Sequence, residues 1–297
     1  EGFPTHLCGY ARNCLGYTAR MIKDLGGEIP PEAPMGGMPK PALLLSSGIS
    51  CDARYKWFQA LGRYLDVPVW VFELPLPGVE ESATEGIYED NINFVVEGLR
   101  EFVAFIERLM GKKMDWDKLD ETQRDIEEIC RIWHEANELR KAKPCPMHSR
   151  DFWSAMTGAL FPSGDLKELI QLYQKTYDEV KDRVDNHICA IPEEKYRIVF
   201  AELPPWHSLR FFDKLAERGW NFVMESWNYH PPLPIDMSGI SDPLERIARL
   251  TYQWYDARSL SALQEGIYYS AGYIYLDYAK EYKCDGAFLH TLLTCRA

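Results

Sequence analysis

Two short apolar runs flank an amphipathic helical pattern in the first quarter of the chain. Residues 42–45 form the first run and residues 69–72 the second, and each has the length of a buried strand. Between them, from Asp52, apolar residues recur at helical spacing until Val67-Pro68 interrupts the pattern. A strand, a helix and a strand within about 30 residues predict a βαβ unit with parallel strands and a right-handed crossover.

Long amphipathic helices follow this unit. Apolar positions predict one helix through residues 95–109 and a further helical stretch from about 121 to 141. The Lys-Pro-Cys-Pro sequence at residues 143–146 then interrupts any regular element. Ser-Gly-Asp at residues 163–165 predicts the N-cap of another long helix, which continues to Val184.

A second strand–helix–strand pattern comes after the break. Residues 197–201 and 220–224 have the pattern of buried strands, and a helix that begins at Ser208 is expected between them. A helix from about residue 260 to 282 is then expected to lead into a last strand at residues 286–290. The chain therefore repeats the order of elements of its first quarter.

The two βαβ patterns also agree in detail. Phe58 and Leu61 of the first have the same internal offset as Phe212 and Leu215 of the second, 154 positions later. This correspondence indicates two related domains.

The predicted fold class is α/β, with two related Rossmann-like domains whose short parallel sheets are flanked by helices, plus extra helices. A chain of 297 residues and 34.4 kDa exceeds the usual size of one domain. We expect the domains to meet near residues 143–149. The first then covers residues 1–145, with its βαβ unit at about 42–75, and the second covers residues 146–297, with its βαβ unit at about 196–225.

The two ends of the chain suggest a segment of a longer polypeptide. The sequence begins with Glu1 rather than methionine, and it stops at Cys295-Arg296-Ala297 directly after an apolar run. We therefore expect the second domain to be truncated at its C-terminal end.

Composition narrows the classes of protein to consider. The chain has 45 acidic and 33 basic residues and a net charge of −12, which argues against a nucleic-acid or anionic-membrane partner because either requires a positive face. Hydrophobic residues make up 46% of the chain, which argues against intrinsic disorder. The sequence has neither an apolar run of the ~18 residues that a membrane span needs nor a signal peptide. We expect a soluble, cytoplasmic protein.

The cysteines have three possible roles. A disulfide scaffold is disfavoured, because a chain with this large a core does not need one. Buried, inert thiols are the second role, which we expect for Cys130, Cys189 and Cys284. Metal ligation is the third, although the sequence contains no Cys-x-x-Cys pair. Spacing alone leaves these roles open for the eight cysteines, Cys8, Cys14, Cys51, Cys130, Cys145, Cys189, Cys284 and Cys295.

Two of these thiols follow predicted strands. Ligands of open parallel α/β sheets bind beyond the carboxyl ends of the strands. Cys51 comes just after the first predicted strand and Cys295 just after the last, so both are expected at carboxyl edges, where they could face a shared cleft. In the second domain the corresponding loop is Pro-Pro-Trp-His at residues 204–207, as if one domain carried a cofactor and the other faced a substrate.

Four stretches together carry a family resemblance. They are His-Leu-Cys-Gly-Tyr-Ala-Arg at residues 6–12; Gly-Gly-Met-Pro-Lys-Pro at 36–41, leading to Cys51; Trp-Phe-Gln-Ala-Leu at 57–61, with Asp-Val-Pro at 66–68; and Cys-Asp-Gly-Ala-Phe-Leu-His at 284–290, leading to Thr-Cys-Arg at 294–296. In order and spacing these stretches resemble the benzoyl-CoA reductase / 2-hydroxyacyl-CoA dehydratase subunit family, almost from end to end of the chain.

The resemblance implies a cofactor and its ligands. Subunits of this family hold a 4Fe–4S cluster with three cysteines far apart in sequence, and the matching residues here are Cys8, Cys51 and Cys295. Three thiolates leave one iron open to a water, a sulfur species or a substrate oxygen. Cys14, six residues after Cys8, is either a fourth ligand or a neighbouring free thiol.

The resemblance also implies partners and a reaction. A homologous second subunit completes a heterodimer, a separate ATP-hydrolysing iron–sulfur activator protein injects single electrons, and the substrate is an acyl-CoA. We expect an iron–sulfur subunit of an ATP-dependent benzoyl-CoA reductase, which dearomatises its substrate through a ketyl radical. Residues 36–41, which resemble reductase subunits, and the tryptophans of the expected cleft loops favour this branch.

Other functions stay open. The first alternative is an (R)-2-hydroxyacyl-CoA dehydratase subunit, in which the radical expels the 2-hydroxyl group. The second is a double-cubane or electron-transfer iron–sulfur protein of the same fold, for which Cys14 and Cys145 leave room. An α/β protein without metal is the remaining possibility.

Two histidines are the candidate catalytic residues. His207 stands beside Trp206 in the loop of the second domain, and His6 precedes the first expected ligand. Imidazole titrates near neutrality, so either residue could transfer a proton, with a merely solvated side chain as the alternative. His290 lies on an apolar strand, where a hydrogen-bonded core histidine is expected.

Overall fold

The computed structural model arranges the chain as two compact units. The first contains the described residues up to 75 together with Asn93–Lys112, and the second contains 86–92 and the described part of Lys113–Thr291. The predicted division into domains 1–145 and 146–297 stays a prediction. The residues that the structure describes are 7–33, 36–47, 51–75, 86–228, 235–252 and 271–291.

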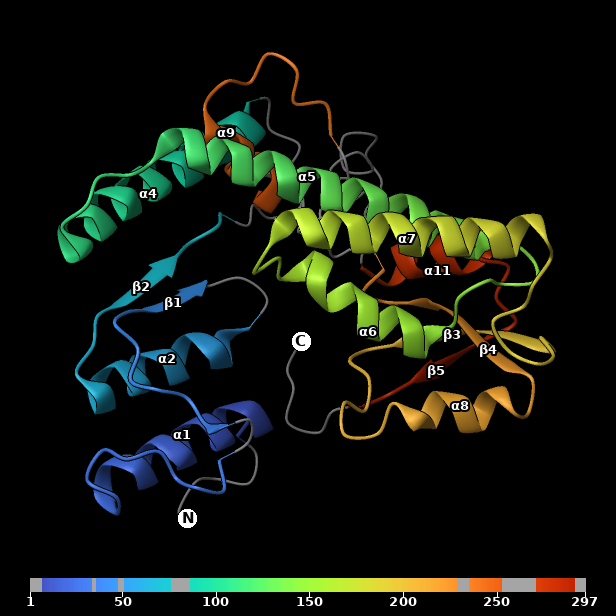
Figure 1. The fold of residues 1–297 in the computed structure, drawn as a ribbon, viewed down its shortest axis with the longest axis horizontal. Coiled ribbons are helices and arrows are strands. Elements are labelled where there is room, and N and C mark those ends of the chain that lie inside the picture. Colours follow the sequence, from blue (N-terminus) through green and yellow to red (C-terminus); the bar gives the residue numbers. More distant parts are fainter. Residues whose placement is uncertain are drawn as a thin grey trace. The chain divides into compact units, whose positions relative to one another are not determined.

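The first unit contains the predicted βαβ motif. Strand β1 (Leu44–Ser47) pairs in parallel with β2 (Val69–Phe72), and helix α2 (Asp52–Leu65) connects them (Figure 1). This confirms the predicted topology, with β1 shifted by two residues. Helix α1 (Gly9–Lys23), which the apolar pattern did not predict, packs against α2.

Helices cover both faces of this two-stranded sheet. Leu44 and Val69 pack with apolar residues of α1 and α2, among them Leu15 and Leu61. On the opposite face, Trp70 stacks on Phe105 of helix α4 (Ile87–Met110), with ring centroids 5.0 Å apart. Covering both faces is what a parallel sheet requires, because its strands are apolar on both sides.

Two residues set the close fit of α2. A Cβ at Gly62 would lie 2.4 Å from Cγ2 of Val69, so glycine allows the helix to approach β2. The helix ends at Asp66, whose left-handed backbone (φ 51°) turns the chain into β2. The Val67-Pro68 interruption predicted from the sequence therefore coincides with a helix C-cap.

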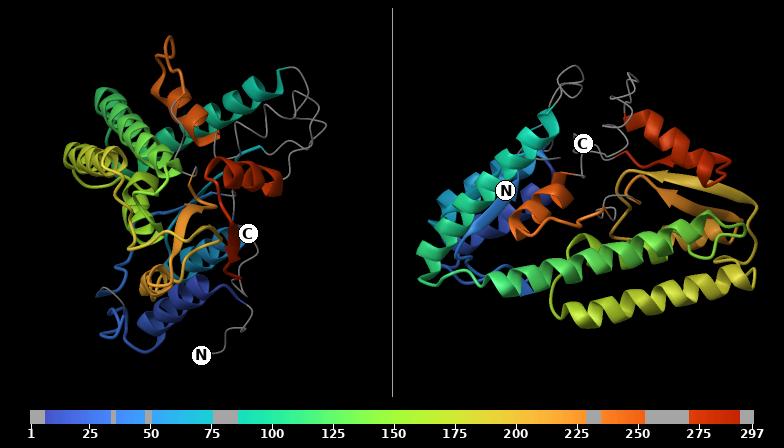
Figure 2. Two further views of the ribbon diagram at one scale, coloured as in Figure 1. Left: turned by 90° about the vertical axis from the view of Figure 1, so that its right-hand side faces the viewer. Right: turned by 90° about the horizontal axis from the view of Figure 1, so that it is seen from above.

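The second unit is built on a three-stranded parallel sheet in the order β4-β3-β5. The strands confirm the predicted positions, and Asp165 caps α7 as expected by accepting hydrogen bonds from the amides of Lys167 and Glu168. Helices α5 and α7 run side by side (Figure 2). The elements are α5 (Trp116–Glu138), the short η2 (Leu139–Lys141), α6 (Ser149–Leu160), α7 (Leu166–Asp185), β3 (Tyr196–Ala201), α8 (Arg210–Ala216), β4 (Trp220–Glu225), α9 (Pro243–Tyr252), α11 (Ala271–Glu281) and β5 (Gly286–Leu289).

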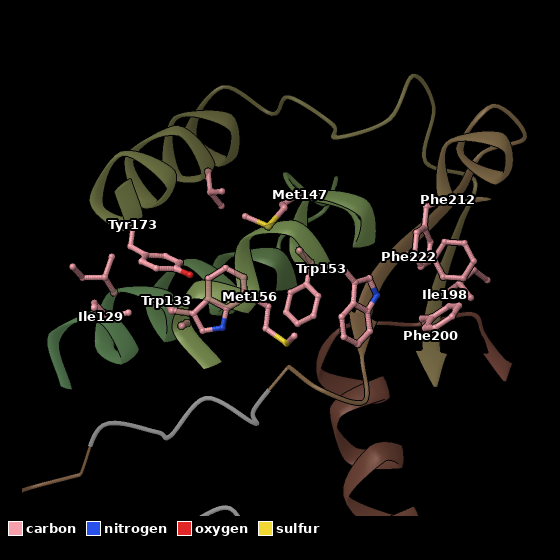
Figure 3. Packing of buried hydrophobic residues seen from close by; sticks show 14 residues of the cluster. Ile129, Trp133, Met147, Trp153, Met156, Tyr173, Ile198, Phe200, Phe212 and Phe222 are labelled. Carbon is pink, nitrogen blue, oxygen red and sulfur yellow. The ribbon is translucent and has the colours of Figure 1, made fainter. Parts of the chain in front are cut away.

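An aromatic core joins the helices to this sheet (Figure 3). Its rings make edge and tilted contacts with centroids 5.0–6.4 Å apart, a geometry that adds to the gain from burial alone. Alternate strand residues Val199 and Val223 face the other side of the sheet, where they pack with Tyr278 and Tyr282. The successive rings of the core are Tyr173, Trp133, Phe152, Trp153, Phe200 and Phe212.

The structure thus confirms a mixed α/β fold with short parallel sheets flanked by helices. That the chain consists of two related Rossmann-like domains stays a prediction. Within the described residues, no helix is both long and apolar enough to cross a membrane. Of the helix expected at 260–282, residues 260–270 lie outside the described part, and the remainder corresponds to α11.

A buried ion pair lies in the second unit. The guanidinium of Arg140 donates to both carboxylate oxygens of Glu225, at 2.6 and 2.9 Å, and both side chains have 0% exposure. Arg140 also donates to the carbonyl of Met147, and Ser149 hydrogen-bonds to Glu225. These contacts join η2, the start of α6 and the end of β4.

We expect Glu225→Ala to lower the free energy of unfolding by about 3–5 kcal/mol, because it leaves the buried Arg140 charge without its partner. The matched control is Glu128→Ala, which removes a carboxylate that pairs with Arg131 where both side chains are 41% exposed. That change should cost less than about 1 kcal/mol. Urea unfolding followed by circular dichroism measures both, and equal costs for the two variants would contradict the expectation.

Candidate metal centre

Cys8 stands at the beginning of α1. It is the N-cap residue of this helix, and its carbonyl accepts the first intrahelical hydrogen bond, from the Arg12 amide at 2.9 Å. The side chain is half-buried, and Sγ accepts no hydrogen bond from the described first turn. The thiol is therefore not used in capping its own helix.

Cys51 has the corresponding position on α2. It lies beyond the carboxyl end of β1, as the sequence predicts, and it is the N-cap of the helix. Its Sγ accepts a hydrogen bond from the Arg54 amide at 3.3 Å, and the Arg54 guanidinium reaches back to Oγ of Ser47, at the end of β1, at 2.7 Å. Backbone and side-chain contacts thus fix the orientation of this thiol.

Two helix N-termini therefore present cysteines within one unit. Helices α1 and α2 pack against each other, and both begin on the same side of the unit (Figure 1). Unsatisfied amides and the helix dipole place partial positive charge at each N-terminus, which favours an anionic side chain there.

These two residues fit an iron–sulfur ligand set. Both are half-buried free thiols, and thiolate is the soft donor that iron–sulfur clusters use. The third expected ligand, Cys295, lies outside the described residues, as does the catalytic candidate His6. Among the residues that the structure describes, no group of three His, Cys, Asp or Glu side chains is arranged for a metal ion, and only two of the three expected ligands are among them.

Cys14 lies close enough to Cys8 to interact with it electrostatically. The pKa of the Cys14 thiol is raised, chiefly by burial and then by the neighbouring Cys8. Cys8 is the N-cap of α1, and Cys14 lies in the second turn of this helix. The role of Cys14, as a fourth ligand or a neighbouring free thiol, stays a prediction.

Among the other described cysteines, Cys130 and Cys145 are buried, whereas Cys189 and Cys284, which were also expected to be buried, are half-buried. Burial raises the pKa of Cys130 to about 12 and that of Cys284 to about 12, so both thiols stay protonated. Cys145 has 0% exposure, and its Sγ donates to the Met147 carbonyl at 3.1 Å. A thiol that donates to a carbonyl is protonated and is not poised to bind a metal.

The described histidines differ in their surroundings. His207 is exposed on the turn between β3 and α8, next to Trp206, whose ring contacts Trp153 with centroids 5.6 Å apart. Its catalytic role stays a prediction. Nδ1 of His290, just beyond β5, lies 2.6 Å from the Leu203 carbonyl. The histidine is therefore hydrogen-bonded as expected, but it is half-buried and does not lie in the core.

Comparison with known proteins identifies relatives of two kinds. The (R)-phenyllactyl-CoA dehydratase alpha subunit of Clostridium sporogenes is 27% identical over 222 residues, which cover 74% of this chain and 51% of the relative. The (R)-2-hydroxyisocaproyl-CoA dehydratase alpha subunit of Clostridioides difficile is 24% identical over 299 residues, 100% of this chain and 66% of the relative. The benzoyl-CoA reductase B subunit of Thauera aromatica is 25% identical over 313 residues, again 100% of this chain and 66% of the relative.

The chain thus spans about half to two thirds of the length of these curated relatives. The family model described as 2-hydroxyglutaryl-CoA dehydratase, D-component, matches residues 1–297. The four sequence stretches that contain or lead to the expected cysteine ligands already indicated this relationship. The chain therefore belongs to the 2-hydroxyglutaryl-CoA dehydratase D-component family.

Proposed function

We propose that this chain is part of the cluster-bearing subunit of an (R)-2-hydroxyacyl-CoA dehydratase. The observation that carries the proposal is the position of Cys8 and Cys51 at the N-termini of two packed helices in one unit. The family match and the dehydratase alpha subunits among the relatives support it. Of the functions expected from the sequence, the dehydratase alternative thus takes precedence over the reductase.

The cofactor of the proposal is a 4Fe–4S cluster held by Cys8, Cys51 and Cys295. When bound, such a cluster supplies single-electron chemistry and an iron with an open coordination position. The chain supplies the setting: the Arg54 amide orients Sγ of Cys51, and the first turns of α1 and α2 direct partial positive charge toward the ligands. Packed apolar residues, including Leu15 and Leu61, hold together the two helices that begin at these cysteines.

The partners in this proposal are a homologous second subunit, an ATP-hydrolysing iron–sulfur activator and an acyl-CoA. Relatives named as alpha or B subunits support the partner subunit. In the proposed reaction the substrate loses its 2-hydroxyl group and a proton from C3, together one water molecule, and becomes an enoyl-CoA. His207 is the chain's described candidate for proton transfer, because it is exposed to solvent in the second unit.

A benzoyl-CoA reductase subunit is the second candidate. The specific observation in its favour is similarity to a reductase B subunit across the whole chain. An electron-transfer protein with two clusters is less well supported, because Cys145, one of the thiols it would use, is buried and donates to a carbonyl.

We expect Cys8→Ser, Cys51→Ser and Cys295→Ser each to lose most of the bound iron and the visible absorption of the cluster. Serine is a good N-cap residue, so α1 and α2 should stay folded while the soft donor is lost. Iron and sulfide analysis of anoxically purified protein, with circular dichroism as the test of folding, measures the effect.

The matched control is Cys189→Ser, which changes another half-buried thiol in the second unit. It should keep about four irons per chain, as one cubane cluster requires, and Cys14→Ser should behave in the same way. A Cys51→Ser protein with full iron content and activity would show that the ligand assignment is wrong.

The reaction itself is tested with the full-length complex, its activator and ATP under anoxic conditions. We expect dehydration of an (R)-2-hydroxyacyl-CoA to the enoyl-CoA and no conversion of benzoyl-CoA. Mass spectrometry of the thioesters measures both reactions. Reduction of benzoyl-CoA without dehydration of 2-hydroxyacyl-CoA would assign the chain to the reductase branch instead.

A further inference from the structure

A cavity of about 340 Å³ lies within the first unit, between α1 and the segment that follows it. Its volume is in the lower part of the range of small-molecule sites. Four residues of α1 with polar side-chain atoms and Met21 form one wall, and mostly apolar residues form the other. The lining residues are Asn13, Cys14, Tyr17, Thr18, Met21, Ile29, Pro30, Ala33, Gly37 and Met38.

The far wall of the cavity is fixed to α1. An ion pair joins Arg20 of the helix to Glu32, and the Gly27 amide donates to the Met21 carbonyl at 2.8 Å. Gly37 has a left-handed backbone (φ 76°), and a Cβ there would lie 2.2 Å from Cγ2 of Ile29. Glycine at this position therefore allows the segment to fold back on its own residues Ile29 and Ala33.

The charge of the lining decides what the cavity can hold. None of the described residues that line it is charged, so a carboxylate would lose its hydration without gaining a cation. An aliphatic or aromatic group would instead replace water against Met21, Ile29 and Pro30. The side chains of Asn13, Tyr17 and Thr18 carry the stronger hydrogen-bonding groups of the lining.

The cavity lies along the same helix as one of the proposed cluster ligands. Cys8 is the N-cap of α1, and the lining of the cavity begins at Asn13 and Cys14 of this helix. A group bound in the cavity would therefore lie along α1, about two helical turns or less from Cys8.

We propose that this cavity receives the apolar acyl side chain of the thioester substrate and so selects aliphatic or aromatic acyl groups over those that end in a second carboxylate. The inference rests on the proposed function, and it adds the substrate class and the residues that determine it. Met38, which is 42% exposed, stands at the rim, and Ala33, 8% exposed, lies deeper in the wall.

Binding to the full-length complex, purified anoxically with its partner subunit, tests this selectivity. The probes are 3-phenylpropanoyl-CoA and glutaryl-CoA, which lack the 2-hydroxyl group and are not dehydrated, with acetyl-CoA as the reference. By isothermal titration calorimetry we expect 3-phenylpropanoyl-CoA to bind at least about tenfold more tightly than glutaryl-CoA. Equal affinities, or tighter binding of glutaryl-CoA, would overturn the inference.

Two variants test whether the preference for apolar acyl groups arises in this cavity. Ala33→Phe fills the cavity and should weaken 3-phenylpropanoyl-CoA about tenfold while acetyl-CoA binding is unchanged. Met38→Lys, at the exposed rim where a charge does not threaten folding, should reverse the preference in favour of glutaryl-CoA. The matched control is Met110→Lys, which places the same charge on a 63% exposed residue of α4 that does not line the cavity.

The outcomes separate the two proposals. If acetyl-CoA and every other CoA ester fail to bind, the proposed function fails and the inference fails with it. If the esters bind but Met38→Lys behaves like Met110→Lys, the proposed function stands and the acyl site is not in this cavity.

Discussion

The buried ion pair between Arg140 and Glu225 is the constraint on which the second unit depends. A guanidinium and a carboxylate without solvent exposure are tolerable only when each satisfies the other. Arg140 meets this condition by donating to both oxygens of Glu225 and to the carbonyl of Met147. Because these partners come from η2, β4 and the segment before α6, the three elements must assemble together.

A second buried cation extends this constraint to the other side of the sheet. Arg197, at the start of β3, pairs with Glu194 at 2.8 Å and donates to the carbonyls of Tyr282 and Ala142. Asn228, just beyond β4, hydrogen-bonds to the Tyr282 hydroxyl and to Asn137. The end of α11, the end of α5 and the sheet are therefore tied by polar groups, while the aromatic core fills the space between them.

The difference between local apolar patterns and long-range polar contacts explains what the sequence could predict. Strand β2 coincides with the apolar run at residues 69–72, and the cap of α7 follows from Asp165, because both signals are local. Helix α1 was not predicted, although its buried residues Ala11, Leu15, Thr18 and Met21 recur at helical spacing. Only Leu15 and Met21 of these four are strongly apolar, so the pattern is weak. The burial of charged residues was the hardest feature to predict. Nothing in the sequence distinguishes Arg140 from other charged residues until folding brings Glu225, 85 residues later, into contact with it.

The candidate metal centre shows the same limit in its cysteines. Their spacing left scaffold, core and ligand roles open, and in the structure two of the thiols differ in the direction of a hydrogen bond. Sγ of Cys51 accepts from the amide of Arg54, whereas Sγ of Cys145 donates to a carbonyl. The sulfur of Cys145 must keep its proton in order to donate in the core, whereas the sulfur of Cys51 needs no proton for the bond that it accepts. The distinction depends on which backbone group folding brings to each thiol, and therefore on contacts that no spacing of cysteines along the chain contains.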